Sequence, residues 1–171
     1  KRKGKTGRSR SGGAKMMAGT ARRRMRLRAI ASYDGRNFHG VQKNVRTQDN
    51  TELRTITSTL ETSLWPALDQ NVKFRVAGRT DAGVSATGQV ISFDVESAGE
   101  HDESLISVDG APVQEPAALT AALNDCLPSD LQLRGVEIVP REFDVTRDCK
   151  WKRYRYALPA CSPSADDEDG L

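Results

Sequence analysis

The chain has 171 residues, 37% of them hydrophobic, which is enough for one ordinary domain with tails. No run of 18 apolar residues occurs, so the sequence predicts no transmembrane helix, and three widely spaced cysteines argue against a disulfide framework and for a reducing compartment. Only two histidines and no Cys-x-x-Cys pair occur, so we expect no metal site of the usual zinc type.

Basic residues are concentrated at the N-terminus. Residues 1–28 contain twelve Lys or Arg and no Asp or Glu, whereas the rest has 14 basic and 23 acidic residues. Residues 1–25 have few large apolar side chains to offset the entropy of ordering, so we predict a disordered basic tail. This tail would be a nuclear localisation signal, an organellar transit peptide, an RNA-binding arm or a solvated leader without a specific partner. No secretory h-region follows, so we predict an intracellular protein of the nucleus or cytoplasm, or of an organelle if the tail is a transit peptide.

A strand and a helix come first in the ordered part. Residues 27–33 form a short apolar run before an Asp-Gly turn pair, which predicts a strand. Residues 51–64 place Leu and Ile at helical spacing, with Asp49 or Asn50 as the N-cap. Pro66 is expected to end or kink this helix.

Two strands flank an unusual connection in the middle of the chain. Residues 72–76 and 91–95 alternate apolar and polar side chains, which predicts half-buried strands. The segment 78–88 between them is rich in Gly, Thr, Ser and Ala and is longer than a hairpin needs. Residues 96–115 are polar and acidic, so we predict an exposed loop there.

The last third of the chain predicts one more helix and two strands. A helix over 116–127 begins with Pro in its first turn, and a strand over 131–139 is bulged at Gly135. Residues 151–158 interleave basic and aromatic side chains and predict a further strand. The tail 161–171 is acidic and we expect it to be loose.

The order of these elements predicts an α+β fold of the ferredoxin-like βαββαβ type. Such a fold has an antiparallel sheet with two helices on one face. The strand predicted over 151–158 would be an extra one.

The segment between the two middle strands is the first candidate site. It places the carboxylate of Asp81 two residues from the guanidinium of Arg79, framed by glycines that let the backbone turn sharply and let a ligand come close. The alternative is a loop in which Asp81 makes an Asx-type turn and Arg79 is solvated.

The second candidate site is the basic and aromatic segment near the C-terminus. Aromatic faces stack on unpaired bases and basic side chains bind phosphate, so it is a candidate RNA contact. The alternative is an edge strand protected by charge. No Lys or Arg occurs from residue 80 to residue 132, so a phosphate-binding face must use the N-terminal third and this segment. Its candidate residues are Arg147, Lys150, Trp151, Lys152, Arg153, Tyr154, Arg155 and Tyr156.

From about residue 26 to residue 158 the sequence resembles the TruA family of tRNA pseudouridine synthases. Five segments match in the family's order, and the spelling Gly83-Val84-Ser85-Ala86 is similar to that of eukaryotic members. The matching segments are Tyr33-Asp34-Gly35 with Phe38-His39-Gly40 and Gln42; Gly78-Arg79-Thr80-Asp81-Ala82-Gly83-Val84-Ser85-Ala86 with Gly88-Gln89-Val90; Leu123-Asn124 with Leu127-Pro128 and Asp130-Leu131; Phe143-Asp144-Val145-Thr146-Arg147; and Lys152-Arg153-Tyr154-Arg155-Tyr156.

The resemblance implies an isomerase that converts uridine to pseudouridine in tRNA, mostly in the anticodon arm. It implies that Asp81 is the nucleophile that attacks the flipped uridine. Arg79 would favour the ionised aspartate and help hold the displaced nucleotide. Tyr154 would pack against the uracil and is a candidate to accept the proton removed from its ring. Arg147, Lys152, Arg153 and Arg155 would contact RNA. Bond exchange needs no net redox change, so neither cofactor nor metal is expected.

The chain departs from the family pattern in three ways. Val41 stands where the family usually has Trp, residues 96–115 resemble an insertion, and the family's second catalytic half is absent. We therefore predict a TruA-like N-terminal domain over 26–160 that is a fragment or that acts with a partner half or as a homodimer.

Two other functions are compatible with this topology. One is a ferredoxin-like module that binds RNA without turnover. The other is a small hydrolase of the acylphosphatase kind with Arg79 as its anion binder, which only the topology supports.

Overall fold

The computed structural model describes residues 23–44, 51–97 and 105–158. Most of the predicted basic tail and the whole acidic tail 161–171 lie outside these ranges. The elements are β1 (Arg24–Tyr33), the 3-10 helix η1 (Gly35–Asn37), α1 (Ile56–Leu68), β2 (Arg75–Val76), β3 (Ala86–Glu96), β4 (Ile106–Val108), β5 (Ala111–Val113), α2 (Pro116–Asp125) and β6 (Leu131–Val139).

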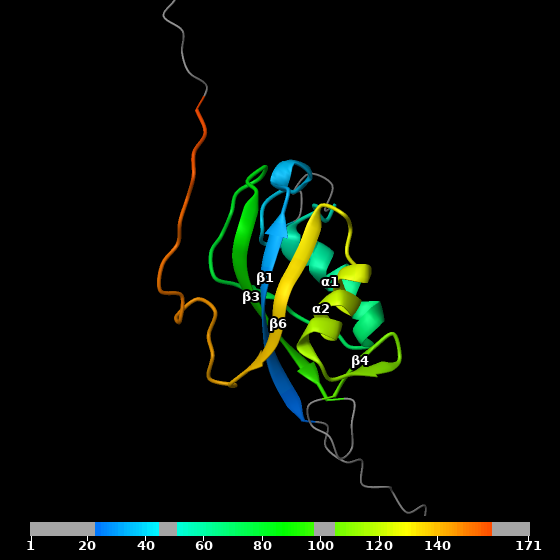
Figure 1. Ribbon diagram of the computed structural model, residues 1–171. Coiled ribbons are helices and arrows are strands. Elements are labelled where there is room, and N and C mark those ends of the chain that lie inside the picture. Colours follow the sequence, from blue (N-terminus) through cyan, green and yellow to red (C-terminus); the bar gives the residue numbers. More distant parts are fainter. Residues whose placement is uncertain (1–22, 45–50, 98–104, 159–171) are drawn as a thin grey trace, which may run out of the picture.

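Four of the strands form one antiparallel sheet in the order β2-β3-β1-β6. The helix α1 connects β1 to β2, yet β3 lies between these two strands, which is the split arrangement of the ferredoxin-like fold. Both helices cover the same face of the sheet (Figure 1). The predicted fold class is therefore confirmed.

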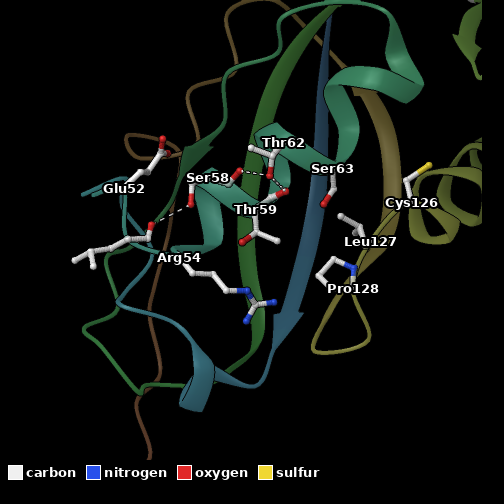
Figure 2. Close-up of a pocket in the computed structure, with 10 residues that line it drawn as sticks. Glu52, Arg54, Ser58, Thr59, Thr62, Ser63, Cys126, Leu127 and Pro128 are labelled. Carbon is white, nitrogen blue, oxygen red and sulfur yellow. Dashed lines mark hydrogen bonds between the residues drawn. The ribbon is translucent and has the colours of Figure 1, made fainter. Parts of the chain in front are cut away.

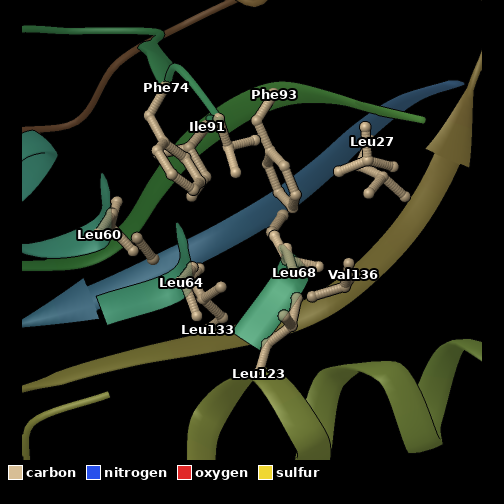
Figure 3. Packing of buried hydrophobic residues seen from close by; sticks show 14 of the residues in the cluster. Leu27, Leu60, Leu64, Leu68, Phe74, Ile91, Phe93, Leu123, Leu133 and Val136 are labelled. Carbon is tan, nitrogen blue, oxygen red and sulfur yellow. The ribbon is translucent and has the colours of Figure 1, made fainter. Parts of the chain in front are cut away.

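The core lies between the helices and this face of the sheet. The side chains that fill it come from β1, β3 and β6 on one side and from α1 and α2 on the other (Figure 3). Phe74 and Phe93 pack with their ring centroids 4.8 Å apart. The largest completely buried side chains include Phe93, Leu27, Ile56, Leu60, Leu64, Leu68, Ile91, Leu123 and Leu133.

The strand β1 begins earlier than the sequence predicts. Arg24 and Met25 were assigned to the tail 1–25, but they pair with Glu96 and Val95 of β3, and Met25 is buried. By contrast, the strand predicted over 72–76 shrinks to the two residues of β2, although Val72 and Phe74 still point into the core. The ends of these strands depend on pairing with β3, which the local pattern does not contain.

The helix α1 begins later than predicted. Its N-cap is Thr55, whose hydroxyl accepts the backbone N–H of Ser58 in a capping box, so the proposed caps Asp49 and Asn50, which lie outside the described residues, were wrong. Pro66 lies inside the last turn, and the helix ends two residues after it. The proline removes one helical hydrogen bond, and its place in the last turn limits the disturbance because only two helical residues follow it.

The C-terminal βα part agrees closely with the prediction. The helix α2 has Pro116 in its first turn but ends at Asp125, and β6 covers the predicted residues. Gly135 has a φ of 58° where the register between β1 and β6 shifts, which confirms the bulge. The Asn124 side chain accepts the N–H of Leu133 and donates to its carbonyl, and so fixes α2 to the outer edge of β6.

The exposed loop predicted over 96–115 is wrong for its second half. The strands β4 and β5 form a hairpin whose turn, Asp109-Gly110, has positive φ at both positions. Ile106 and Val108 are buried, and the N–H of Asp109 donates to the carbonyl of Ala67 in α1. The acidic composition of the segment concealed these two apolar anchors.

The extra strand predicted over 151–158 is also wrong. These residues form no strand and are all exposed, with Trp151 at 72% and Tyr156 at 84% of full exposure. Figure 1 shows this part of the chain as a separate trace on the β3 side of the sheet. Alternating side chains make a strand only where a neighbouring strand accepts the backbone hydrogen bonds, and none does so within the described chain.

Candidate functional site

Residues 77–85, here called the Asp81 loop, connect β2 to β3. Asp81 and Arg79 are both exposed on it. The N–H of Val84 donates to the carbonyl of Asp81 at 3.2 Å, which closes a turn, and Gly83 has a φ of 79° in that turn. The loop therefore presents a carboxylate to solvent at the first residue of a tight turn. Within the described ranges, neither Asp81 nor Arg79 takes part in an ion pair.

The Asp81 loop docks on residues 33–41, here called the η1 segment. The N–H of Val41 donates to the carbonyl of Thr80 at 3.0 Å, and the N–H of Gly83 donates to the carbonyl of Phe38 at 3.1 Å. The hydroxyls of Tyr33 and Thr80 lie 2.8 Å apart. These contacts hold the peptide groups on both sides of Asp81.

Two glycines of the η1 segment permit this close docking. A Cβ on Gly35 would lie 2.1 Å from the carbonyl oxygen of Val84, and the Gly35 N–H donates to the hydroxyl of Ser85 at 2.9 Å. Gly40 has a φ of 92°, and a Cβ there would lie 3.1 Å from the carbonyl oxygen of Thr80. Only glycine brings the two backbones this near at Gly35.

The start of the Asp81 loop is held by β3. The side-chain amide of Gln89, which is buried, accepts the N–H of Gly78 and donates to the carbonyl of the same residue. The N–H of Ala77 donates to the carbonyl of Val90 at 2.9 Å. The segment Gly88-Gln89-Val90 thus fixes the start of the Asp81 loop through hydrogen bonds, a role that the sequence analysis did not predict.

An ion pair lies beneath the η1 segment. Arg54, just before the N-cap of α1, donates two hydrogen bonds to the carboxylate of Asp130, at 2.9 and 2.8 Å. The Arg54 guanidinium also lies 4.0 Å from the ring centroid of Phe38. Sequence reasoning missed this pair because the two residues are 76 positions apart and belong to different elements.

Three groups in this region have perturbed pKa values. Hydrogen bonding to Asp130 raises the pKa of Arg54, and the same hydrogen bonding lowers the pKa of Asp130. Burial raises the pKa of the Tyr33 phenol, against the opposing effect of its hydrogen bonds to Thr80 and Gln89. The pair is therefore ionised and Tyr33 is neutral near neutral pH.

The structure brings one residue of the second candidate site to the Asp81 loop. A Cβ on Gly78 would lie 3.4 Å from the Cε atom of Lys152, so this lysine crosses the start of the loop. In the part of the chain that the structure describes, no hydrogen bond or ring contact joins Tyr154 to the loop, and Tyr154 is 58% exposed. Arg153 instead lies 5.7 Å from the Trp151 ring.

Arg147 and Arg155 are exposed as well. The guanidinium of Arg147 donates to the carbonyl of Glu142, and the backbone N–H of Arg147 donates to the Asp144 carboxylate. Arg155 lies in the segment that has left the sheet. Neither residue is placed at Asp81 by a contact in the structure.

Two cavities lie away from Asp81. A groove of about 630 Å³ runs between α1 and the chain after α2 and is lined by hydroxyls of α1, with Arg54 at its end and Cys126 opposite (Figure 2). A second cavity, of about 480 Å³, lies where β1 begins and β6 ends, and its lining includes Arg23, Arg24, Arg26 and Arg141. It is about 30 Å from the Tyr33 end of β1 at ~3.3 Å per residue.

No metal site or membrane span is formed by the described residues. No group of three His, Cys, Asp or Glu side chains gathers in them, and Cys126 and Cys149 are free thiols. None of their helices has the length and apolar character to cross a membrane.

Comparison with known proteins places the Asp81 loop and the η1 segment within one matched region. Residues 29–147 match a family model described as tRNA pseudouridine synthase. The chain is 37% identical over 134 residues to tRNA pseudouridine synthase A of Corynebacterium glutamicum, covering 78% of this chain and 43% of that protein. It is 37% identical to the protein of that name from Thermus thermophilus over 133 residues, with coverages of 78% and 44%, and 31% identical to that of Shewanella sediminis over 134 residues, with coverages of 78% and 43%. The chain thus spans less than half the length of these relatives.

Proposed function

Because this chain belongs to the tRNA pseudouridine synthase family, we propose that it isomerises uridine to pseudouridine in tRNA, in the anticodon arm, with Asp81 as the nucleophile. The observation that carries the proposal is the Asp81 loop itself. It exposes one carboxylate at the first residue of a turn, and the loop on both sides of this residue is hydrogen-bonded to the η1 segment.

This geometry suits a nucleophile that must be held still in an open site. The Asp81 carboxylate attacks the flipped uridine at its anomeric carbon or at the uracil ring. The bond from the ribose carbon to N1 of uracil breaks, the bond to C5 forms, and the bond between the Asp81 oxygen and the substrate breaks again before the product leaves. The C5 proton leaves to a base and N1 takes up a proton, so the product has the composition of the uridine. No electrons are gained or lost, so the reaction needs no redox partner. Arg79, two residues away and exposed, contacts the displaced nucleotide in this proposal.

Residues after β6 supply RNA contacts in this proposal. Lys152 already lies over Gly78 of the Asp81 loop, where its ammonium can meet phosphate. Tyr154, stacked on the uracil and taking part in proton removal, requires residues 151–158 to move toward Asp81 when RNA is bound. Arg147, Arg153 and Arg155 are exposed and bind the RNA backbone.

We also propose that a second half-domain or a second copy of the chain covers residues 151–158. Four large apolar side chains, Trp151, Tyr154, Tyr156 and Leu158, are between 58% and 86% exposed there. Such a cluster is typical of an interaction surface. Sedimentation of the chain over a range of concentrations tests self-association. A monomer at all concentrations would exclude the second copy and leave a second half-domain as the proposed cover.

The basic leader sets the location in this proposal. Residues 1–22 carry eight Lys or Arg and no acidic residue. This composition suits a nuclear or cytoplasmic RNA-binding arm, or a transit peptide to an organelle. Fusion of these residues to a fluorescent protein distinguishes the three.

The test is release of tritium from tRNA labelled at C5 of uridine. The parent chain should release tritium and Asp81→Asn should not, while both bind tRNA. Asp125→Asn, which changes an exposed carboxylate of α2, is the matched control and should behave as the parent. Release by Asp81→Asn would refute the nucleophile. Binding without release by any variant would favour the RNA-binding module, unless adding a second half in trans restores release.

A further inference from the structure

We propose that Arg54 and Asp130 are positioning residues for Asp81, acting through the η1 segment. The inference rests on the proposed function, because it gives the pair a part in the reaction. Neither side chain touches the Asp81 loop. Each instead fixes the segment on which that loop is docked.

The first step is the contact between the pair and the η1 segment. The Arg54 guanidinium donates to the carbonyl of Asn37 at 3.3 Å and lies over the ring of Phe38. The backbone takes part too, since the N–H of His39 donates to the carbonyl of Arg54 at 2.9 Å and the N–H of Asp34 to the carbonyl of Asp130 at 3.0 Å. The segment is thus held at both ends by the residues of one ion pair.

The second step is the contact between the η1 segment and the Asp81 loop. Phe38, over which the guanidinium lies, uses its carbonyl to accept the N–H of Gly83. Val41 donates its N–H to the carbonyl of Thr80. These two residues therefore hold the carbonyl just before Asp81 and the N–H two residues after it. A shift of Phe38 moves the loop directly.

The geometry of the pair distinguishes it from an ordinary surface ion pair. Exposed pairs contribute little to stability, but here the contact is bidentate and the Asp130 side chain is only 20% exposed. The planar fork of Arg54 satisfies Asp130, Asn37 and the Phe38 ring at once. A lysine has a single charged nitrogen and no plane to lie on the ring.

Figure 2 places Arg54 at the end of the hydroxyl-lined groove, extending toward the side on which Pro128 lies. Asp130 follows Pro128 by two residues, so the pair joins the residue before the N-cap of α1 to the residue before β6. Both residues also contact the η1 segment through their backbones. The pair is therefore built from two parts of the chain that the fold brings together only at this place.

The test compares Arg54→Met, Arg54→Lys and Asp130→Asn with the control Lys73→Met. Lys73 forms an exposed ion pair with Glu61 at 2.8 Å, away from the loop. Residue-resolved hydrogen exchange should show at least tenfold faster exchange of the Val41 and Gly83 amides in Arg54→Met and Asp130→Asn, with the Ile91 amide in β3 unchanged. Arg54→Lys should fall between these variants and the parent, and Lys73→Met should equal the parent.

Kinetics supplies the second readout. In tritium release, kcat should fall at least tenfold in Arg54→Met while KM stays within about twofold, because the pair positions the nucleophile and does not bind RNA. Equal acceleration of exchange at Val41, Gly83 and Ile91 would reduce the pair to a general stabilising contact, and unchanged exchange with unchanged kcat would overturn the inference. If even the parent releases no tritium, altered exchange at Val41 and Gly83 still supports the coupling, and the proposed function alone fails.

Discussion

Gly35 is the position where a single methyl group should displace the Asp81 loop. Its added Cβ would lie 2.1 Å from the carbonyl oxygen of Val84, 2.3 Å from the carbonyl carbon and 2.8 Å from the N atom of Ser85. All three are backbone atoms, which no side-chain rotation can move away. The carbonyl must retreat by about 1.3 Å, the difference between 2.1 Å and the 3.4 Å of ordinary contact.

This retreat reaches Asp81 directly. Val84 donates its N–H to the carbonyl of Asp81, so the two residues move as one turn. A misplacement of about 1 Å in a catalytic group costs about 10²-fold in rate, and overpacking of this kind costs about 1–3 kcal/mol of stability. We expect Gly35→Ala to lose about two orders of magnitude in kcat while tRNA affinity stays near that of the parent.

The control is Gly88→Ala in β3, where an added Cβ meets nothing within 4 Å. That variant should be as active as the parent and at least as stable, since alanine restricts the unfolded chain. Tritium release, thermal unfolding and the amide chemical shifts of Val84 and Ser85 make the comparison. If Gly35→Ala matches Gly88→Ala in activity, melting temperature and these shifts, the close docking of the loop is refuted.

Three other changes have definite outcomes. Arg26 binds Asp94 at 2.7 Å and lowers the pKa of this carboxyl, so the ionised form stabilises the fold above about pH 4, and this contribution is lost as the pH falls through the folded-state pKa. The stability of Asp94→Asn, measured by acid unfolding with circular dichroism, should therefore depend less on pH below 4 than that of the parent. An equal dependence would contradict the assignment. Deleting residues 1–22 removes eight positive charges and should reduce the slope of log K against log salt for tRNA binding, by up to about six. An unchanged slope would mean that these residues do not bind RNA and are a targeting signal or a solvated leader. Tyr154→Ala should weaken tRNA binding by about 1–3 kcal/mol in fluorescence anisotropy, and an unchanged affinity would remove Tyr154 from the RNA contact.

The elements that could be predicted are those whose signals lie within their own residues. The strand β6 has alternating apolar side chains and a glycine at its bulge, and Pro116 marks the start of α2. The hairpin β4–β5 has a signal of the same kind, the Asp109-Gly110 pair between two apolar runs, but the acidic residues around it suggested a solvated loop. Composition averaged over twenty residues hid a two-residue turn signal.

The predicted strand over 151–158 failed for a different reason. Its alternation is real, but the strand at the near edge of the sheet, β2, consists only of Arg75 and Val76. A strand is a property of a pair, so the pattern of one partner does not decide it. The ion pair between Arg54 and Asp130 could not be predicted for the same reason, because nothing in the sequence around either residue indicates its partner.

The proposed nucleophile and the proposed RNA contacts therefore differ in how the described chain supports them. The loop that carries Asp81 is hydrogen-bonded to Phe38, Val41 and Gln89, all of which lie in the described chain. Residues 151–158 have no comparable support and expose their aromatic side chains. Under the proposed function, the chain therefore positions the carboxylate by its own contacts, and residues 151–158 take up their place only against RNA or a covering partner.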